Sequence, residues 1–415
     1  MATATLSKFD YEVRDRQGKM VTGQIEADNQ AAVAAKLKSM GYAPLKISEV
    51  KTSGMQTELK IPGFGDKVKL KDLAIFSRQF ATMIGSGLAL IRALSILAEQ
   101  TENSKLRETI EEVRSDIEQG QALSSSLAKH EKVFPKLYIA MVRAGETAGM
   151  LDEVLIRVAV MLEADVKLRT KIKSAMTYPV IVFVMAILLS TVMLIFIVPV
   201  FADMFADMGA DLPMLTQMLV TLSGFITSWL GILTYIVIPT VLWQVYKRVR
   251  ATEKGRFALD VMKLKVPVFG ILFHKIALTR FARNLSTLMA AGVPILQALE
   301  ITADTVNNGP ISEAIKDVQD SVRQGESMNS PLSRHEIFPP MVVQMIAVGE
   351  ETGNVDGMLE KVSDFYDTEV EAMTESLTAL MEPLMIGVIG GIVGGMVIAL
   401  YMPMFKIFEV IGDAA

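Results

Sequence analysis

Three long stretches without a charged side chain constrain the fold of this chain more than any other feature. The first, Pro179 to Phe201, holds 23 residues, and an apolar helix needs about 20 residues to cross a bilayer. The second holds 35 residues between Asp211 and Lys247, and the third holds 22 residues from Leu384 to Phe405. A segment at membrane depth must satisfy its own backbone hydrogen bonds, so each stretch predicts a transmembrane helix. We predict these helices at 179–201, 221–246 and 383–405.

The overall composition fits a membrane protein that also has sizeable soluble parts. Apolar residues make up 51% of the 415 residues, and the mean hydropathy of +0.38 is high for a soluble protein. The absence of cysteine excludes disulfides and thiolate metal sites. The formal charge of −5 provides no basic field for nucleic acid, so we expect no nucleic-acid partner.

The positive charges around these stretches predict the orientation of the chain. Basic residues precede the first span and follow the second: Lys167, Arg169, Lys171 and Lys173, then Lys247, Arg248, Arg250, Lys254 and Arg256. Because segments rich in Lys and Arg stay in the cytoplasm, both ends face inward and the acidic loop between the spans lies outside. The first residues contain no apolar signal-peptide core, so the N-terminus is predicted to be cytoplasmic. Span three then runs outward.

The chain contains one sequence pattern written twice. At a shift of 205 residues Phe76 falls on Phe281 and Arg78 falls on Arg283. One residue is then lost, and at a shift of 204 a second set matches: Gly145, Glu146, Gly149, Asp152 and Pro179 fall on Gly349, Glu350, Gly353, Asp356 and Pro383. Each copy is therefore a cytoplasmic segment followed by one outward span. The second span is the connector that two units in the same orientation need.

The apolar positions within each copy recur with a helical period. Those of the first copy step by 4, 3 and 4 residues at Leu106, Ile110, Val113 and Ile117, and those of the second at Ile311, Ile315, Val318 and Val322. Turn signals divide each copy into about six helices, so we predict a mainly α fold with a two-layer helical bundle per copy. The helix that begins after Gly149 is expected to run directly into span one.

A different pattern precedes the first copy. Alternating apolar residues around Phe9 and Ile25 predict a hairpin, followed by an Ala-rich helix with Asp28 as N-cap and Gly41 as stop, and then a third strand. The predicted divisions are an N-terminal α/β module (1–50), a linker (51–69), a first cytoplasmic bundle (70–178), span one (179–201), a periplasmic loop (202–220), span two (221–246), a second cytoplasmic bundle (247–382), span three (383–405) and a periplasmic tail (406–415).

The stretch "FSRQFATMIGSGLALIRAL", its echo "FARNLSTLMAAGVPILQAL" and the paired "GETAG" and "GEETG" resemble the inner-membrane platform proteins of type IV pilus and type II secretion machines, the type II secretion F family. The resemblance covers essentially the whole chain. It implies a multi-pass, non-enzymatic hub of the bacterial inner membrane, without a cofactor. Its implied partners are a cytoplasmic hexameric ATPase, prepilin subunits, other inner-membrane assembly proteins and further copies of the chain, in a homodimer or a higher oligomer. The pilus branch is favoured, with a secretion pseudopilus as the alternative.

The repeated Gly-Glu motif has a structural and a functional interpretation. Its glycines permit positive φ at a corner between helices, and its aspartate then lies in the first turn of the next helix. The alternative is a carboxylate-bearing corner exposed to a partner or to an occasional cation, although it lacks the ligand density of a dedicated metal site. The candidate partner-binding residues are Gly145, Glu146, Gly149, Asp152, Gly349, Glu350, Gly353, Asp356, Arg78 and Arg283.

A second group of candidates lies in the membrane. Gly387, Gly391 and Gly395 are four residues apart and form a small-residue stripe, which packs within the protein or its dimer, or else receives a pilin helix. Glu382 precedes span three, where it is exposed at the interface or pairs during assembly. Pro179 and Pro383 open the two repeated spans.

Other classes of protein are disfavoured by what the sequence lacks. His130 and His335 repeat but complete no zinc motif, which favours packing or a turn for them and for His274, and no Walker A pattern occurs. No ionisable residue interrupts the three spans, whereas transporters place such groups at membrane depth. A secondary transporter built on internal repeats is therefore the weaker alternative. We predict no catalytic, cofactor-binding or metal-binding residues.

Overall fold

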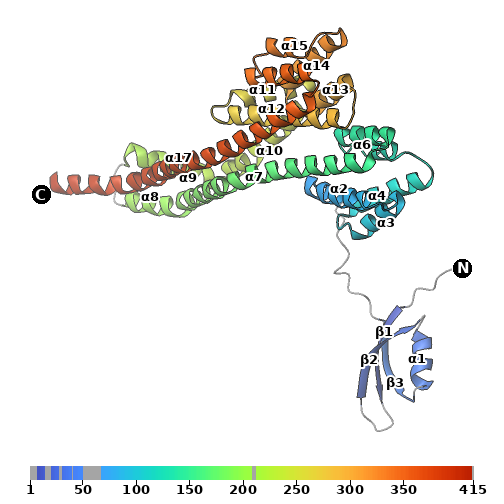
Figure 1. The fold of residues 1–415 in the computed structure, drawn as a ribbon. Coiled ribbons are helices and arrows are strands. Elements are labelled where there is room, and N and C mark those ends of the chain that lie inside the picture. The colour runs from blue at the N-terminus through green and yellow to red at the C-terminus, as the bar shows by residue number, and fades with distance from the viewer. Residues whose placement is uncertain are drawn as a thin grey trace. The chain divides into compact units, whose positions relative to one another are not determined.

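The computed structural model describes residues 7–14, 20–27, 30–39, 41–49, 67–207 and 212–413. The chain divides into two compact units, Met1–Asp66 and Lys67–Ala415 (Figure 1). The predicted cap Asp28 and the linker as far as residue 66 lie outside the described residues.

The first unit is a three-stranded antiparallel sheet with one helix. Its elements are β1 (Ser7–Arg14), β2 (Met20–Ala27), α1 (Gln30–Ser39) and β3 (Ala43–Glu49). The strand order is β2-β1-β3, so the first strand is central. Phe9 and Val13 lie on the same face of β1 and are buried with Val33 and Leu37 of α1. Gly41, at φ 84°, follows the helix in the left-handed conformation that glycine adopts without steric conflict.

All the regular secondary structure described in the second unit is helical, and its two copies correspond helix for helix. The first copy consists of α2 (Leu70–Gly85), α3 (Leu90–Gln100), α4 (Ser104–Glu118), α5 (Leu123–Ala128), α6 (Lys136–Ala148) and α7 (Leu151–Val192). The second consists of α12 (Phe269–Ala290), α13 (Ile295–Thr305), α14 (Gly309–Arg323), α15 (Asn329–Arg334), α16 (Pro340–Thr352) and α17 (Val355–Asp413). The six helices expected per copy are confirmed.

The same local signals form these helices twice. The Asn103 side chain accepts a hydrogen bond from the Leu106 amide (3.0 Å), and Asn308 accepts one from Ile311 (3.1 Å), so each copy caps its third helix in the same way. The aromatic pairs also recur, with ring centroids 6.0 Å apart for Phe76 and Phe134 and 5.0 Å apart for their counterparts Phe281 and Phe338. One hydrophobic core includes buried residues of both copies.

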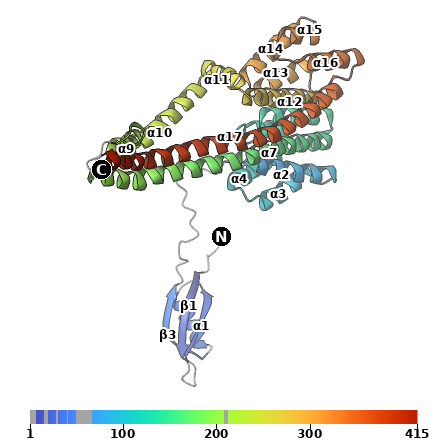
Figure 2. The same ribbon diagram turned by 90° about the vertical axis from the view of Figure 1, so that its left-hand side faces the viewer.

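Ion pairs also join the two copies. Lys136 on α6 pairs with Asp304 on α13 at 2.9 Å, and Lys171 on α7 pairs with Glu371 on α17. The long helices α7 and α17 lie side by side in both ribbon views (Figures 1 and 2). The two copies therefore form one continuous helical unit.

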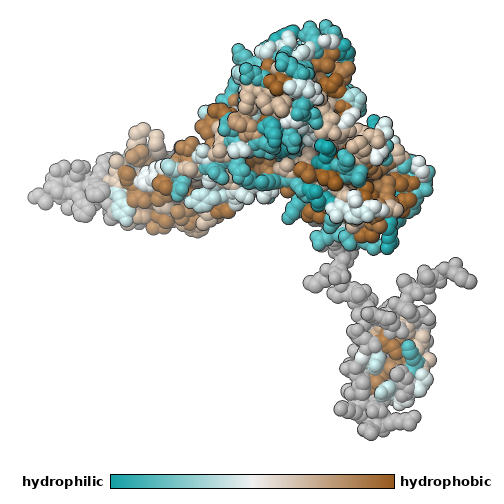
Figure 3. All heavy atoms as spheres, viewed as in Figure 1, coloured by the Kyte–Doolittle hydropathy of each residue, from teal (hydrophilic) through white to brown (hydrophobic). Residues whose placement is uncertain are grey.

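Within the residues that the structure describes, three helices are long and apolar enough to cross a membrane: Leu151–Met204, Trp229–Ala251 and Val355–Met402. The helix after Gly149 does run into the first apolar stretch, through the π-helical turn η1 (Met193–Ile197) and α8 (Val198–Asp207). Figure 3 shows hydrophobic surface over the region of α7 to α9. The connector consists of α9 (Met214–Thr227), α10 (Trp229–Ala251) and α11 (Glu253–Lys265).

The prediction that residues 221–246 form one continuous membrane-spanning helix was wrong. The extended backbone of Ser228 separates α9 from α10, and its hydroxyl accepts a hydrogen bond from the Gly231 amide (3.1 Å), which caps the new helix. The α9 segment packs against the other apolar helices, where Ser223 donates to the Leu194 carbonyl (2.5 Å) and Thr216 donates to the Ala399 carbonyl. These bonds satisfy the hydroxyls in an apolar surrounding.

Candidate functional site: the repeated helix corners

The Gly-Glu motifs lie at the ends of α6 and α16, where each copy turns into its long helix. Gly149 (φ 72°) and Gly353 (φ 70°) adopt the left-handed conformation and end those helices. The amides of Met150 and Asn354 donate back to the carbonyls of Gly145 and Gly349, both at 2.9 Å. These bonds close the same tight turn twice.

The first glycine of each motif has a different role from the one predicted. Gly145 and Gly349 are helical rather than at positive φ, so that part of the expectation was wrong. A Cβ on Gly145 would lie 3.0 Å from the Val154 side chain, and one on Gly349 would lie 2.8 Å from the Cα of Val355. Glycine is required here because the following long helix approaches the backbone closely.

The glutamate of each motif holds the start of a short helix. The Glu146 carboxylate accepts hydrogen bonds from the amides of Leu123 (2.6 Å) and Ser124 (3.0 Å), at the N-terminus of α5. In the second copy Glu350 accepts from the Met328 amide (2.7 Å) and the Ser327 hydroxyl (2.6 Å), just before α15. A negative charge is favourable at this position because the first amides of a helix have no partner within it. Both glutamates are half-buried.

The aspartates that complete the motifs lie in the first turns of α7 and α17, as predicted. Asp152 is exposed, whereas Asp356 is half-buried and its carbonyl accepts a hydrogen bond from the Ser286 hydroxyl (2.8 Å). The first corner therefore exposes Gly149, Met150 and Asp152 among other residues, whereas Glu146 is half-buried.

The two arginine candidates form equivalent ion pairs within their own copies. Arg78 on α2 donates to both carboxylate oxygens of Glu163 on α7, at 2.6 and 2.5 Å. Arg283 on α12 pairs with Asp367 on α17, the residue 204 positions after Glu163. The hydrogen bond from Arg78 lowers the pKa of Glu163, whereas burial raises the pKa of Asp367 against the opposing effect of Arg283. Each pair ties the first helix of a copy to its long helix.

We expect these two pairs to differ in strength. The Arg78 side chain is 40% exposed and that of Arg283 only 14%, so solvent screens the first pair more. Arg283→Met should lower the free energy of unfolding by about 1–2 kcal/mol, and Arg78→Met by less than about 0.5 kcal/mol. Thermal unfolding of the detergent-solubilised protein, followed by circular dichroism, measures both. Equal shifts in the two variants would contradict the assigned role of burial.

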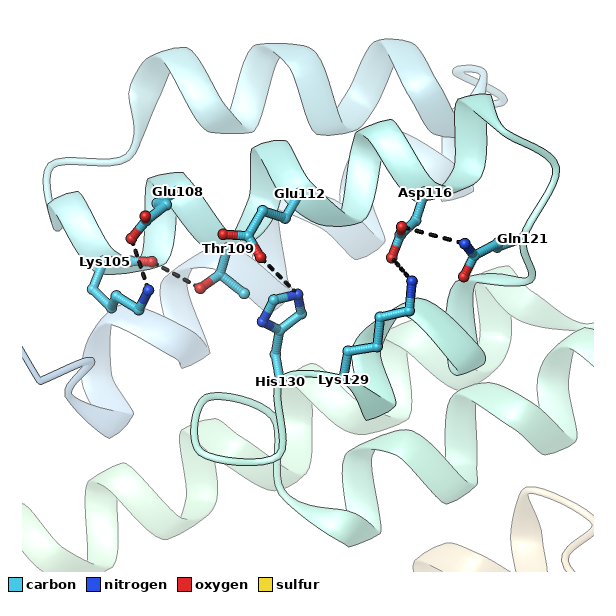
Figure 4. Close-up of polar contacts among 8 residues, drawn as sticks. All are labelled: Lys105, Glu108, Thr109, Glu112, Asp116, Gln121, Lys129 and His130. Atoms are coloured by element: carbon cyan, nitrogen blue, oxygen red, sulfur yellow. Dashed lines mark hydrogen bonds and ion pairs between the residues drawn. The ribbon is translucent and has the colours of Figure 1, made fainter.

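The repeated histidines bind acidic partners on the neighbouring helix. His130 lies 3.4 Å from Glu112 on α4, where Lys129 pairs with Asp116 at 2.7 Å (Figure 4). His335 lies 2.9 Å from Asp317 on α14, the same arrangement one copy later. These contacts tie the turn after each short helix to the helix before it. His274 contacts the Ile337 carbonyl through Nε2 at 2.6 Å.

The membrane candidates are mostly exposed. In the ranges that the structure describes, a Cβ on any of Gly387, Gly391 or Gly395 would meet no atom within 4 Å apart from the nearby backbone of its own helix. The prediction that the stripe packs against another helix of the same chain was therefore wrong. Glu382 and Pro383 are exposed, and Pro179 is buried inside α7. Contact of the stripe with a second copy or with a pilin helix stays a proposal. Among the described residues no group of three or more His, Cys, Asp and Glu side chains could hold a metal ion.

These features define a class of protein: a duplicated helical unit in which each copy turns at a Gly-Glu corner into a long apolar helix. The family model of the type II secretion system (T2SS) protein F matches residues 76–199 and 281–403, and the model of its N-terminal domain matches 1–48. The chain belongs to the type II secretion system protein F family. The two matched ranges begin 205 residues apart and end 204 apart, which confirms the duplication and its shift.

Curated relatives match almost the whole chain. A type IV pilus assembly protein PilC of Thermus thermophilus is 46% identical over 97% of this chain and 99% of its own length. The PilC of Pseudomonas aeruginosa is 38% identical over 92% and 100%. The type II secretion system protein F of Vibrio cholerae is 32% identical over 88% and 90%.

Proposed function

We propose that this chain is the non-enzymatic inner-membrane platform of a type IV pilus assembly machine. The observation that carries the proposal is the near full-length similarity to relatives named as type IV pilus assembly proteins, at 36–46% identity. A second candidate, the platform of a type II secretion pseudopilus, is supported by relatives named type II secretion system protein F at 32–34% identity. The higher identities favour the pilus.

The proposed arrangement in the membrane follows from the charges around the apolar helices. Residues 70–178 and 247–382 form two cytoplasmic bundles, and the N-terminus, with a small α/β module (1–50) and its linker (51–69), is also cytoplasmic. Spans at 179–201 and 383–405 run outward, with the tail 406–415 in the periplasm. The connector crosses within α10, so the loop between the first two spans extends beyond 202–220 to include α9.

The continuous helices provide a mechanical route from cytoplasm to membrane. From Leu151 to Pro179, α7 covers 29 residues without a break, which is about 40 Å at 1.5 Å per residue. The second copy repeats this length from Val355 to Pro383. A cytoplasmic hexameric ATPase that moves a helix corner would thereby move the membrane end of the same helix, where prepilin subunits are inserted or extracted.

The exposed corner around Gly149, Met150 and Asp152 is the proposed contact for the ATPase, and the glycine stripe on α17 is the proposed contact for a prepilin helix or a second copy of the chain. A charge reversal at Glu146 would change folding and binding together, because its carboxylate caps α5. Asp152→Lys tests binding alone, since Asp152 is exposed. We expect the variant to keep its helical circular dichroism and to lose co-purification with the motor ATPase.

Deletion of the gene tests the proposed function directly. We expect the deletion strain to lose surface pili while solute uptake is unchanged, and a plasmid copy to restore the pili. Electron microscopy of the cells measures fibre number. Normal pili together with defective protein secretion would favour the secretion platform, and normal pili with normal secretion would overturn both candidates.

A further inference from the structure

The turn between α11 and α12 exposes apolar side chains outside the predicted spans. Val266, Val268 and Ile271 are 41%, 45% and 55% exposed, and Met262 on the last turn of α11 is 59% exposed. Most apolar side chains of the two bundles are instead buried in one core. Exposed apolar side chains that gather in one segment mark an interaction site.

The backbone at the centre of this turn is strained. Val268 has φ 68° and ψ −55°, a region that disfavours β-branched residues. The sequence "LKVPVFG" at 264–270 repeats "LKIPGFG" at 59–65, and the first copy has Gly63 where the second has Val268. Glycine would adopt this conformation without strain. Since nearly half of the Val268 side chain is exposed, its burial within the chain does not account for the valine.

The turn lies at the end of the second bundle that is nearest to span three. Phe269 and Leu272, at the start of α12, pack in one apolar cluster with Met373 and Leu377 of α17. Leu377 precedes the predicted start of the span at Pro383 by six residues, which is about 9 Å along a helix. The turn is therefore close to the proposed membrane surface.

The segment around the turn is basic. Between Glu253 and Glu300 the sequence has a single acidic residue, Asp260, and that side chain is buried, pairs with Lys263 (2.7 Å) and accepts from the Gly309 amide (3.2 Å). The basic residues that precede the turn or lie in it are Lys247, Arg248, Arg250, Lys254, Arg256, Lys263 and Lys265. Basic residues beside a span attract anionic lipid headgroups.

An aromatic residue marks the same interface on the connector. Lys247 lies over the ring of Trp243, with Nζ 5.3 Å from the ring centroid, at the cytoplasmic end of the apolar part of α10. Tryptophan beside lysine is typical of the headgroup level of a membrane. The basic segment therefore begins at the lipid surface and returns toward it at the turn.

We infer that the turn from Lys265 to Ile271 is a lipid-binding element, which inserts Val266, Val268 and Ile271 among the headgroups of anionic phospholipids. The nearby lysines and arginines hold the headgroups, and the lipid covers the apolar side chains that the bundle leaves exposed. The inference rests on the orientation given under the proposed function. It assigns the second cytoplasmic bundle a fixed contact with the membrane surface.

The absence of cysteine in the natural chain makes a site-specific test possible. Val268→Cys, labelled with bimane, is reconstituted as full-length protein in nanodiscs of phosphatidylcholine alone or with 30 mol% phosphatidylglycerol. We expect lipids carrying a nitroxide near the headgroup to quench the label at least twofold in the anionic discs, and less in the neutral ones. Lys263→Gln with Lys265→Gln should remove that difference.

Two labelled controls separate the possible failures. Val348→Cys lies on α16, is as exposed as Val268 at 46%, and should be quenched by aqueous iodide alone. Ile392→Cys lies in span three and should be quenched by deep nitroxide lipids. If Ile392 is not quenched, the proposed membrane arrangement fails. If Ile392 is quenched while Val268 behaves like Val348, or if quenching at Val268 is the same in both kinds of disc, the lipid-binding inference is overturned.

Discussion

Replacement of Gly349 by valine should destabilise the protein by about 3 kcal/mol, which lowers the thermal unfolding midpoint by roughly 4 °C for a helical unit of this size. The first added carbon would lie 2.8 Å from the Cα of Val355 and 3.3 Å from the Asn354 carbonyl oxygen. Both are backbone atoms at the start of α17, so they cannot move aside as a flexible side chain can. The long helix would have to separate from α16.

A matched substitution further along the long helix α17 provides the control. Gly391 is also helical, but within the described part of the chain a Cβ there meets no atom within 4 Å outside the nearby backbone of its own helix, so Gly391→Val should leave the midpoint in detergent unchanged within about 1 °C. Gly145→Ala should lie between the two, because its nearest atoms belong to the Val154 side chain at 3.0 Å. Circular dichroism at 222 nm follows all three variants. Equal midpoints for the Gly349 and Gly391 variants would show that close approach at the corner does not limit stability.

Much of this architecture is predictable because the duplication provides each signal twice. The register from Phe76 to Pro179 predicts which helices correspond, and the helical period of the apolar residues predicts about six per copy. Capping residues such as Asn103 and Asn308 and turn glycines such as Gly149 act locally, so their effect is visible within a few residues of sequence.

The parts that sequence could not predict depend on contacts between distant residues. Arg78 and Arg283 were recognised as a repeated pair, but their acidic partners lie more than 80 positions away and follow only from the packing of two helices. Gly145 and Gly149 are the same residue type in one motif, yet one admits a neighbouring helix and the other a left-handed turn. The break at Ser228 lies in a long uncharged stretch, so no charged residue marks it in the sequence. The only local signal is the Ser228 hydroxyl, which caps the next helix.

Replacement of Glu146 by alanine should destabilise the first bundle by about 2–3 kcal/mol, because two amides at the start of α5 would lose a charged acceptor. Both amides belong to buried residues, Leu123 and Ser124, so water reaches them poorly as a substitute. Hydrogen exchange of the full-length protein should show the largest loss of protection in Leu123–Ala128. Glu350→Ala should have the same effect on the segment around Met328, where the carboxylate also accepts from Ser327.

Asp152→Ala is the matched control, since this carboxylate belongs to the same motif but is exposed and should contribute less than about 0.5 kcal/mol. The two substitutions therefore separate the two interpretations of the motif. If Glu146→Ala and Asp152→Ala were equally mild, the glutamate would be available to a partner in the way an exposed carboxylate is. A large effect at Glu146 with none at Asp152 would mean that the glutamate acts through α5, because it holds this short helix beside the corner. The exposed Asp152 would then be the residue of the motif that contacts a motor directly.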